Sequence, residues 1–340
     1  MLKRALARLV VNRQRRHGYP VESLESKHVD LTHPFPNDSS CFYGGDAAGN
    51  AFIARLAFRG PQRAPECWLD FRPAGQSSVG LPTNPGPERD GFGLGELAFT
   101  CELPGKRWRL SYHGPLTEAA EGRVADGSVE LSFDSTHPLY DYAASSDRRL
   151  VAEAIAAQRW NRRFFRQLKD LEQVHYEQFG RLAGRVASGG RTFELDLVSV
   201  RDHSFGSRDW SAWNRHYWLS GVSLDGHGFT AVAICYDFCG PLYAGFTTTP
   251  TGESDAIVAC TPLEEIARTQ PWPERGTLEI ETRSGRRHRL GFHRQGVFPY
   301  VMDDVYLMRE GIGAFELDGR PMWGLCEFGF KKERYARLLP

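Results

Sequence analysis

Residues 201–210, RDHSFGSRDW, bring together the side chains best suited to chemistry. A histidine titrates near neutral pH, so His203 is suited to proton transfer. Asp202 and Asp209 could orient its imidazole, or could act as acid or base themselves if they are buried. The segment is expected between two strands, where a scaffold can present a loop. These residues are therefore the first candidates for catalysis.

Two arginines accompany this histidine. Arg201 and Arg208 could keep the aspartates ionised, or could clamp a carboxylate or phosphate of a ligand with paired hydrogen bonds. A structural hypothesis competes with the catalytic one. Arginine and aspartate satisfy each other well, and a buried ion pair does not indicate catalysis. A salt-bridged clasp that closes one end of a barrel therefore stays open as the alternative.

A second pair of ionisable residues lies upstream, in a segment expected to form a strand. His175 and Glu177 are two positions apart, so both side chains point to one face. If that face is the interior of a barrel, two ionisable groups stand in an apolar cavity and are suited to acid/base work. The alternative is a pair at the barrel mouth that is bonded to arginine or to the backbone.

Other kinds of site have weaker support in the sequence. His175, Glu177 and His203 could together form a metal site of two histidines and one carboxylate, but no HxH or HExxH spacing fixes them. Ser204 lacks the GxSxG setting of a nucleophilic serine. Phosphate loops and dinucleotide fingerprints are absent from the sequence. We therefore expect neither a metal ion nor a cofactor.

The elements that would position these residues are mostly strands. From residue 41 onwards, short segments of alternating apolar residues recur between glycine-rich turns, and a second series follows a basic amphipathic helix. The sequence therefore predicts an all-β fold of two tandem barrels or sandwiches with an N-terminal helix and one long linking helix. The predicted parts are an N-terminal amphipathic helix and linker at 1–29, a first β domain at 30–146, a linking helix at 147–172 and a second β domain at 173–340.

The two β series resemble each other. Residues 49–54, GNAFIA, align with residues 226–231, GHGFTA, about half a chain later, and each copy follows an aromatic strand. Together with the matching strand rhythm, this similarity supports a duplicated β unit. Asp318 and Gly319 are expected to form a hairpin turn.

Composition restricts the class of protein. Lys+Arg and Asp+Glu both number 42, so the net charge is zero and nucleic-acid binding is not expected. The seven cysteines include no CxxC pair, which indicates reduced core thiols in a cytoplasmic protein. No apolar run approaches the roughly 20 residues that span a bilayer.

The N-terminal segment is predicted to form a basic amphipathic helix. Leu2, Leu6, Leu9 and Val10 fall on one side of it, and arginines fill its last turn. One hypothesis docks this helix onto its own domain. The other lays it on an anionic membrane surface as a peripheral contact.

Three segments in this order resemble a known superfamily. They are residues 175–184 (HYEQFGRLAG), residues 201–210 and residues 315–330 (FELDGRPMWGLCEFGF). The chain is similar to the two-domain, lipocalin-like (calycin) β-barrel proteins of the carotenoid 1,2-hydratase, AttH and Diels–Alderase-like types, and above all to an uncharacterised bacterial branch. Phe205 stands where a tryptophan is usual. The resemblance covers residues 35–335.

This resemblance implies two barrels around an apolar cavity. Relatives of this type hydrate, isomerise or cyclise isoprenoid- or polyketide-like substrates without a redox cofactor. Asp202, His203 and Asp209 match the signature segment, and His175 and Glu177 match the strand before it, so the resemblance gives these residues a location but no established role.

Two functions are carried forward from the sequence. The leading hypothesis is a cofactor-independent lyase or isomerase, of hydratase or cyclase type, that acts on a hydrophobic small molecule. Aromatic side chains would line its cavity and stabilise a cationic intermediate. These are Trp210, Trp213, Tyr217 and Trp218, with Arg201 and Arg208 as further ligand contacts. The alternative is a non-catalytic binding protein for a lipid or other apolar small molecule.

Overall fold

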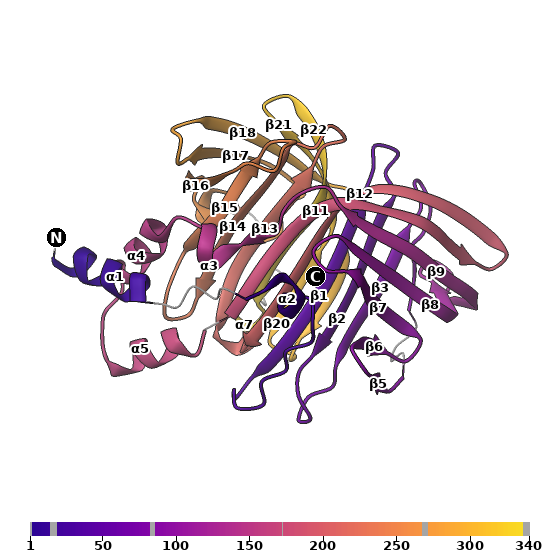
Figure 1. Ribbon diagram of the computed structural model, residues 1–340, viewed down its shortest axis with the longest axis horizontal. Coiled ribbons are helices and arrows are strands. Elements are labelled where there is room, and N and C mark those ends of the chain that lie inside the picture. Colours follow the sequence, from indigo (N-terminus) through magenta and orange to yellow (C-terminus); the bar gives the residue numbers. More distant parts are fainter. Residues whose placement is uncertain (1, 14–18, 82–85, 172, 267–270, 336–340) are drawn as a thin grey trace. The chain divides into compact units, whose positions relative to one another are not determined.

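The chain divides into two compact units, each built on its own β-barrel (Figure 1). The computed structural model describes residues 2–13, 19–81, 86–171, 173–266 and 271–335. The first barrel unit comprises Gly18–Tyr140 and His175–Gly206. The second barrel unit comprises Met1–His17, Asp141–Val174 and Ser207–Pro340. The predicted all-β, two-barrel architecture is confirmed.

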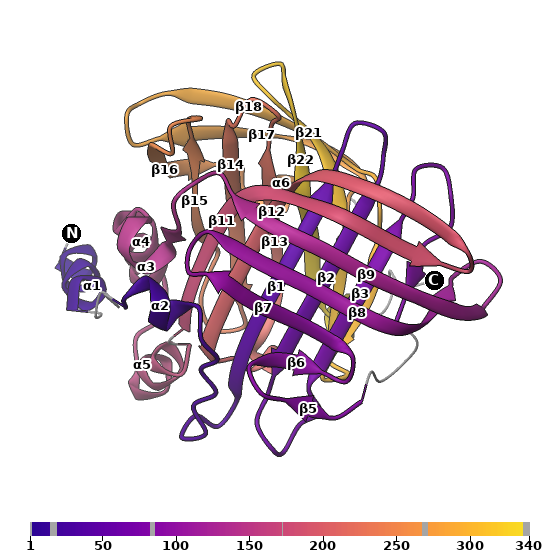
Figure 2. The same ribbon diagram turned by 45° about the vertical axis from the view of Figure 1, so that its right-hand side comes forward.

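Eight strands of the described chain close the first barrel. Their order is β11, β12, β1, β2, β3, β4, β8 and β9, and β9 pairs back onto β11 (Figure 2). The bounds are β1 Pro36–Gly45, β2 Ala51–Phe58, β3 Glu66–Arg72, β4 Val79–Gly80, β8 Arg107–Glu118, β9 Arg123–Ser135, β11 Gln173–Ser188 and β12 Arg191–Ser207. Short strands β5 (Glu88–Arg89), β6 (Phe92–Leu94) and β7 (Leu97–Leu103) extend the sheet from β8, and β10 (Tyr140–Asp141) flanks β11.

Strand alternation fills this barrel with aromatic and aliphatic side chains. Phe52, Ala54, Leu56 and Phe58 of β2 point to the same face and belong to one buried core, as their spacing in the sequence predicts. Further core rings come from the other strands: Phe42, Phe71, Phe92, Phe99, Trp108 and Phe133. The interior of the first barrel is therefore largely occupied by the protein's own rings.

The second barrel is closed in the same way. Strands β13, β14, β15, β16, β17, β18, β21 and β22 follow in this order, and β13 pairs with β22. The bounds are β13 Trp213–Val222, β14 Gly228–Tyr236, β15 Leu242–Thr248, β16 Ser254–Cys260, β17 Arg275–Thr282, β18 Arg287–Arg294, β21 Ile312–Leu317 and β22 Arg320–Lys331. A hairpin of β19 (Phe298–Met302) and β20 (Tyr306–Glu310) attaches to β22.

Local sequence explains the hairpins that were predicted. Asp318 and Gly319 both have positive φ angles, 51° and 83°, and connect two directly paired residues of β21 and β22. Positive φ at both positions is the requirement of a type I′ turn, which aspartate followed by glycine meets. The aligned segments 49–54 and 226–231 also take equivalent places, because each leads from a turn into the second strand of a hairpin, β1–β2 or β13–β14.

Helices occupy a small part of the chain. They are α1 Leu2–Arg13, α2 Val21–Leu24, α3 Tyr142–Ser145, α4 Arg148–Ala157, α5 Arg162–Lys169, α6 Leu263–Ile266 and α7 Lys332–Tyr335. The prediction of a single linking helix is wrong, because Gln158 adopts extended backbone angles and Asn161 caps a new helix through Phe164 N. None of the described helices is long and apolar enough to cross a membrane.

The predicted domain boundary also differs from the observed division. Residues 175–206 were assigned to the second β domain, but β11 and β12 complete the first barrel, between β9 and β1. Hydrogen bonding between strands that are distant in the sequence decides this assignment, and alternation within each strand carries no information about it.

Candidate functional site

His203, near the end of β12, lies between a carboxylate and a phenol inside the first barrel unit. Its Nε2 is 2.6 Å from Asp38 Oδ1, and its Nδ1 is 2.6 Å from the hydroxyl of Tyr176. At most 1% of each of these three residues is exposed. Such short contacts fix the position of the ring on both sides. We call Asp38, Tyr176 and His203, with the ion pair described next, the His203 cluster.

A buried ion pair adjoins the tyrosine. Arg201 contacts Glu25 at 2.6 Å, and the side chains are 1% and 2% exposed. Arg201 also donates to the Tyr176 hydroxyl at 3.3 Å, and its guanidinium lies 4.9 Å from the centre of the Trp108 ring. The cluster thus joins two acids, two bases and a phenol in a dry environment.

The barrel strands place these groups in the interior. Arg201 and His203 share the alternation of Leu195 and Leu197, which belong to the apolar core. Trp108 and Phe92, the rings that contact Arg201 and His203, belong to that core too. Polar side chains therefore replace the apolar ones where β12 approaches its end.

The segment before β1 covers this end of the barrel. The Leu24 carbonyl accepts a hydrogen bond from the Tyr176 hydroxyl at 2.7 Å, and the backbone N–H of His28 donates to Asp38. The His28 ring stacks on Phe205 with 4.2 Å between ring centres. Main-chain and side-chain contacts of α2 and of the residues after it therefore seal the cluster.

A cleft opens in the same unit, close to this covering segment. It measures about 710 Å³ and is lined by Lys27, Glu88, Arg89 and Asp90. The Lys27 ammonium lies 3.9 Å from the centre of the Phe58 ring. Phe58 contacts Phe92, and Phe92 contacts His203 with 5.2 Å between ring centres. Two layers of aromatic rings thus separate the cleft from the imidazole.

Burial controls the charge states in the cluster. It raises the pKa of the Tyr176 hydroxyl well above its usual range, so the phenol keeps its proton at neutral pH. Burial works against the charge of Arg201, but Tyr176 and Glu25 beside it raise its pKa. Arg201 therefore stays a cation, and Tyr176 is a neutral donor.

The single hydroxyl proton has two acceptors within reach. If Tyr176 donates to Leu24 O, His203 donates from both ring nitrogens, to Tyr176 and to Asp38. If Tyr176 donates to Nδ1, the imidazole is neutral and keeps its proton on Nε2. The two arrangements differ by a proton and require almost no movement of heavy atoms, which is the geometry that proton transfer needs.

The predicted loop at residues 201–210 is not a loop. Residues up to Ser207 belong to β12, and Asp209 caps a short 3₁₀ helix, η1 (Trp210–Ala212), by accepting from Ser211 N at 2.9 Å. The division between the two units falls at Gly206. Asp202 is buried, and its side chain points away from the face that His203 uses. The aspartate that contacts the imidazole is Asp38.

The pair His175 and Glu177 also differs from expectation. Tyr176 points into the cluster, so these two neighbours face away from the barrel interior, although Glu177 is completely buried. The condition for acid/base work by this pair, that their shared face is the barrel interior, is therefore not met. Among the described residues, no group of three or more His, Cys, Asp or Glu is arranged to hold a metal ion.

The remaining predicted ligand contacts lie in the second barrel unit. The Arg208 guanidinium lies 5.4 Å from the Trp210 ring and donates to Gln173 at 3.2 Å. Trp210 and Trp213 contact each other with 5.0 Å between ring centres. Tyr217 and Trp218 are neighbours on β13, so their side chains point to opposite faces of the sheet. Tyr217 belongs to the core of the second barrel, and Trp218 packs outside that core against Tyr142.

A second histidine cluster underlies these tryptophans. His216 Nδ1 is 2.5 Å from the hydroxyl of Tyr306, and Nε2 contacts Glu327. Burial works to raise the pKa of Glu327, but the charge and hydrogen bond of His216, with a hydrogen bond from Glu310, lower it. Each barrel unit therefore contains a buried Tyr–His–carboxylate arrangement with the same ring nitrogens facing the same kinds of partner.

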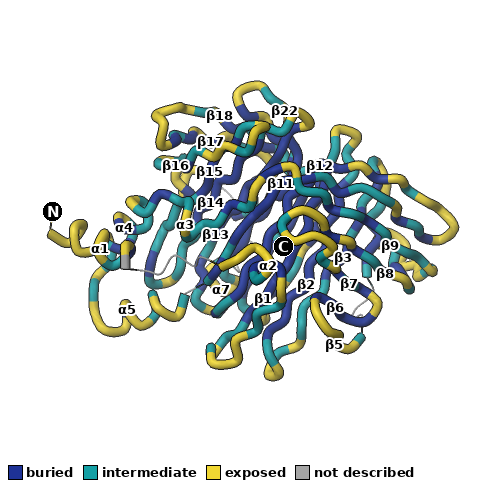
Figure 3. Tube along the Cα trace, viewed as in Figure 1, coloured by how far each residue is buried: buried dark blue, intermediate teal, exposed yellow. Residues whose placement is uncertain are grey.

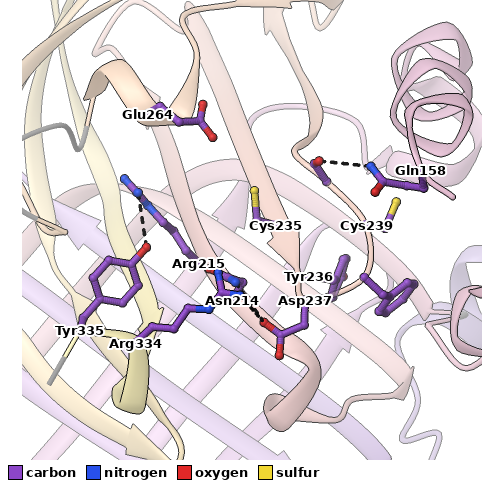
Figure 4. Close-up of a pocket in the computed structure, with 12 residues that line it drawn as sticks. Gln158, Asn214, Arg215, Cys235, Tyr236, Asp237, Cys239, Glu264, Arg334 and Tyr335 are labelled. Atoms are coloured by element: carbon purple, nitrogen blue, oxygen red, sulfur yellow. Dashed lines mark hydrogen bonds and ion pairs between the residues drawn. The ribbon is translucent and has the colours of Figure 1, made fainter.

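A polar cleft of about 380 Å³ lies elsewhere in the second barrel unit (Figure 4). Its lining includes Arg215, which donates to the Tyr335 hydroxyl at 3.4 Å, and Glu264. Burial raises the pKa of Cys235 and Cys239 to about 11, so both lining thiols are protonated at neutral pH. None of the described lining residues was predicted to be a site residue, and Cys235 and Cys239 are among the cysteines expected to be reduced core thiols.

Sequence reasoning missed Glu25 and Asp38 altogether and attached no role to Tyr176. Asp38 lies 165 residues from His203, and Glu25 lies 176 residues from Arg201. The one available signal was alternation, which places Arg201, His203 and Tyr176 on the inner faces of their strands.

Comparison with known proteins gives the family. The sequence model of a domain of unknown function, DUF7064, matches residues 22–331. The chain belongs to the DUF7064 family. The match begins within α2, so it contains the covering segment and every residue of the His203 cluster. A search of curated proteins found no match for this DUF7064 chain.

One solved structure shares the fold of this DUF7064 protein, and two others align with it less well. An AttH-like protein from Nitrosomonas europaea aligns with a TM-score of 0.57 and 14% identity over 94% of this chain and 98% of its own. Kievitone hydratase from Nectria haematococca aligns with a TM-score of 0.47 and 10% identity, over 88% and 90% of the two chains. CghA aligns with a TM-score of 0.47 and 10% identity, over 87% and 88%. The likeness to the AttH-like protein and the two closed barrels confirm the expected lipocalin-like, two-barrel fold of the AttH type.

Proposed function

We propose that this DUF7064 protein is a cofactor-independent acid/base enzyme, a lyase or isomerase that acts on a hydrophobic small molecule at the His203 cluster. The observation that carries the proposal is the position of His203 between the Asp38 carboxylate and the Tyr176 hydroxyl, 2.6 Å from each. A buried imidazole with a movable proton can donate to and accept from a substrate that has no charge of its own.

The residues of the cluster take different parts. His203 and Tyr176 exchange the proton with the substrate, so they are the proposed catalytic residues. Asp38 is a positioning residue, because it fixes the ring and stabilises the imidazolium form. The Arg201–Glu25 pair neutralises itself and supplies a hydrogen bond that keeps the Tyr176 hydroxyl in place. Asp202, Asp209, His175 and Glu177 receive no part in this mechanism.

Hydration illustrates the balance of the proposed chemistry. A proton from the cluster adds to one carbon of an alkene, and the other carbon becomes cationic. Water oxygen bonds to that carbon, and the proton that the water releases returns to the cluster. The net change is the addition of one water molecule. If the cation loses a different C–H proton to His203 instead, the product is an isomer.

The surroundings fit an apolar substrate. The rings of Phe92 and Trp108 lie next to the cluster and could stabilise a cation through their π faces, and Phe58 lies behind Phe92. The cleft near Lys27 is the proposed entrance, and a substrate that enters there must displace Phe92 or the covering segment to reach Tyr176. Nitrosomonas AttH-like protein supports the fold of the proposed enzyme and does not bear on its reaction.

Deuterium transfer tests the proposal without knowledge of the natural substrate. Purified protein is incubated in D₂O with isoprenoid, phenolic and polyketide-like alkenes, and mass spectrometry follows deuterium at carbon. His203→Gln and Tyr176→Phe should lower the transfer rate roughly 10²-fold or more. Tyr112→Phe is the matched control, since Tyr112 is also buried in this barrel and donates to Pro115 O at 2.7 Å. This control should keep the wild-type rate.

The alternative functions give different outcomes in the same experiment. A non-catalytic binding protein would bind an apolar compound, seen by quenching of tryptophan fluorescence, but would transfer no deuterium. A purely structural clasp would show itself if His203→Gln and Tyr176→Phe both unfolded the first barrel while Tyr112→Phe did not. Either result would overturn the enzymatic proposal.

A further inference from the structure

Helix α1 has two apolar sides, and the structure uses only one of them. Ala7 and Val11 are buried, 0% and 3% exposed, in a small core that they share with Ile155 of α4 and Phe164 of α5. Leu2, Leu6 and Leu9 are 75%, 42% and 54% exposed. Figure 3 shows α1 as a largely exposed helix of the second barrel unit.

The exposed leucines form a regular stripe. They follow each other at spacings of four and three residues, so they lie on one face of the helix. The sequence predicted that this leucine side could dock onto the protein itself. Docking does occur, but through the smaller side chains, Ala7 and Val11, and the larger apolar side chains are left outward.

The charged side chains of α1 all have one sign, although Arg4 and Arg8 lie nearer the side of Ala7 and Val11 than the leucine stripe. The Lys3 ammonium, nearer the stripe, donates to Gln158 O. Helix α1, LKRALARLVVNR, contains no acidic residue, and Lys3, Arg4 and Arg8 are exposed. Helix α5 in the same unit, RRFFRQLK, also lacks acidic residues, and it carries the partly exposed Phe165. Exposed leucines with neighbouring cations are the combination by which interfacial helices bind anionic lipid.

We infer that α1 lies on an anionic lipid surface, with Leu2, Leu6 and Leu9 in the boundary between headgroups and acyl chains and the positive charge of the helix attracting the anionic headgroups. Its 12 residues are about 18 Å long, much less than the roughly 30 Å of a bilayer core, so the contact is peripheral. A second copy of the chain is a poorer partner, because two helices without acidic residues repel each other. The lipid surface supplies the opposite charge.

This surface contact is independent of the chemistry proposed for the His203 cluster. The cluster lies in the first barrel unit, and α1 belongs to the second. A membrane-bound position would nevertheless suit a protein whose proposed substrate is apolar, because such molecules concentrate in bilayers.

Vesicle co-sedimentation of the full chain, untagged at its N-terminus, tests the inference. Vesicles of phosphatidylcholine with about 25% phosphatidylserine should sediment the protein, and vesicles of phosphatidylcholine alone should do so much less. The double variant Leu6→Ser/Leu9→Ser should bind at least about tenfold more weakly, since it removes most of the inserted apolar surface. Neutralising Arg4 and Arg8 to glutamine should weaken binding roughly fivefold per charge, and added salt should mimic this effect.

The matched control is Leu224→Ser, because Leu224 is 68% exposed in the same unit but belongs to a turn between β13 and β14. This variant should bind vesicles like the wild type. The inference fails if the wild type does not sediment with phosphatidylserine vesicles, or if the Leu6→Ser/Leu9→Ser variant sediments equally well. It also fails if the leucine stripe instead mediates a dimer, seen by analytical ultracentrifugation without lipid and abolished by the same variant.

Discussion

The buried pair of Arg201 and Glu25 gives the sharpest test of how the first barrel is held together. Replacing Glu25 by glutamine keeps the shape of the side chain and an oxygen that can accept from Trp108 Nε1. The only change of interest is the loss of the negative charge 2.6 Å from Arg201. Arg201 would then remain as a cation with 1% of its side chain exposed.

The expected magnitude follows from this burial. Removing one partner of a desolvated ion pair costs about 3–5 kcal/mol, because the remaining charge has neither water nor a counter-ion. Replacing both charges costs much less. The double variant Glu25→Gln/Arg201→Met should therefore be more stable than Glu25→Gln alone, although it loses the bond to Tyr176 and the contact with Trp108. The methionine keeps most of the buried apolar stem.

Hydrogen exchange measured by mass spectrometry is the suitable assay, since it reports on peptides of the first barrel separately. The amides of β12 and β1 should exchange roughly 10²- to 4 × 10³-fold faster in Glu25→Gln than in the wild type, and the double variant should recover much of their protection. An increase of less than about tenfold in Glu25→Gln would refute the reasoning. The single variant Arg201→Met completes the cycle. A double variant whose loss of stability equals the sum of the losses in Glu25→Gln and Arg201→Met would also refute the reasoning, because the charges would then not be coupled.

Three further predictions concern other parts of the chain. Asp147→Ala should lower the free energy of unfolding of α4 by about 1 kcal/mol, because Asp147 caps the helix by accepting from Arg149 N. Asp147→Asn should keep most of the stability, and hydrogen exchange of α4 measures both variants. Interactions with His216 depress the pKa of Glu327. The ionised Glu327 should therefore stabilise the fold above the usual glutamate pKa, and this contribution should be lost as the pH falls through the depressed pKa. The acid branch of a curve of stability against pH should be shallower in Glu327→Gln. Burial raises the pKa of Cys326 to about 12, so alkylation of this thiol with iodoacetamide at pH 8 should require unfolding by urea, and rapid labelling of the native protein would contradict its burial.

Much of the fold could be predicted from local patterns. The alternation in β2 and the Asp318–Gly319 turn depend only on neighbouring residues, and both agree with the structure. The assignment of β11 and β12 to the first barrel could not be predicted in this way. It depends on the pairing of β12 with β1, which lies more than a hundred residues earlier in the chain.

The site shows the same limit. The chemistry of histidine was reason enough to choose His203, but its neighbour in the sequence, Asp202, was the wrong carboxylate. Alternation turns adjacent side chains of a strand to opposite faces, so Asp202 could not share the interior with His203. Asp38, at the start of β1, reaches the imidazole only because the barrel closes. For α1, periodicity identified the leucine side, but the side that docks is that of Ala7 and Val11, through packing with Ile155 of α4 and Phe164 of α5.

The closure of the first barrel by β11 and β12 has a consequence for synthesis of the chain. When Ser135 has left the ribosome, β1 and β9 still lack the strands that join them, and the last of these ends about 72 residues later at Ser207. At roughly 5–20 residues per second, this interval lasts about 4–14 s. Two strand edges of a half-formed barrel are exposed throughout it, and such edges are templates for wrong pairing. Nascent DUF7064 chains should therefore need protection by a chaperone during this interval, and a fragment that ends at residue 146 should aggregate instead of folding.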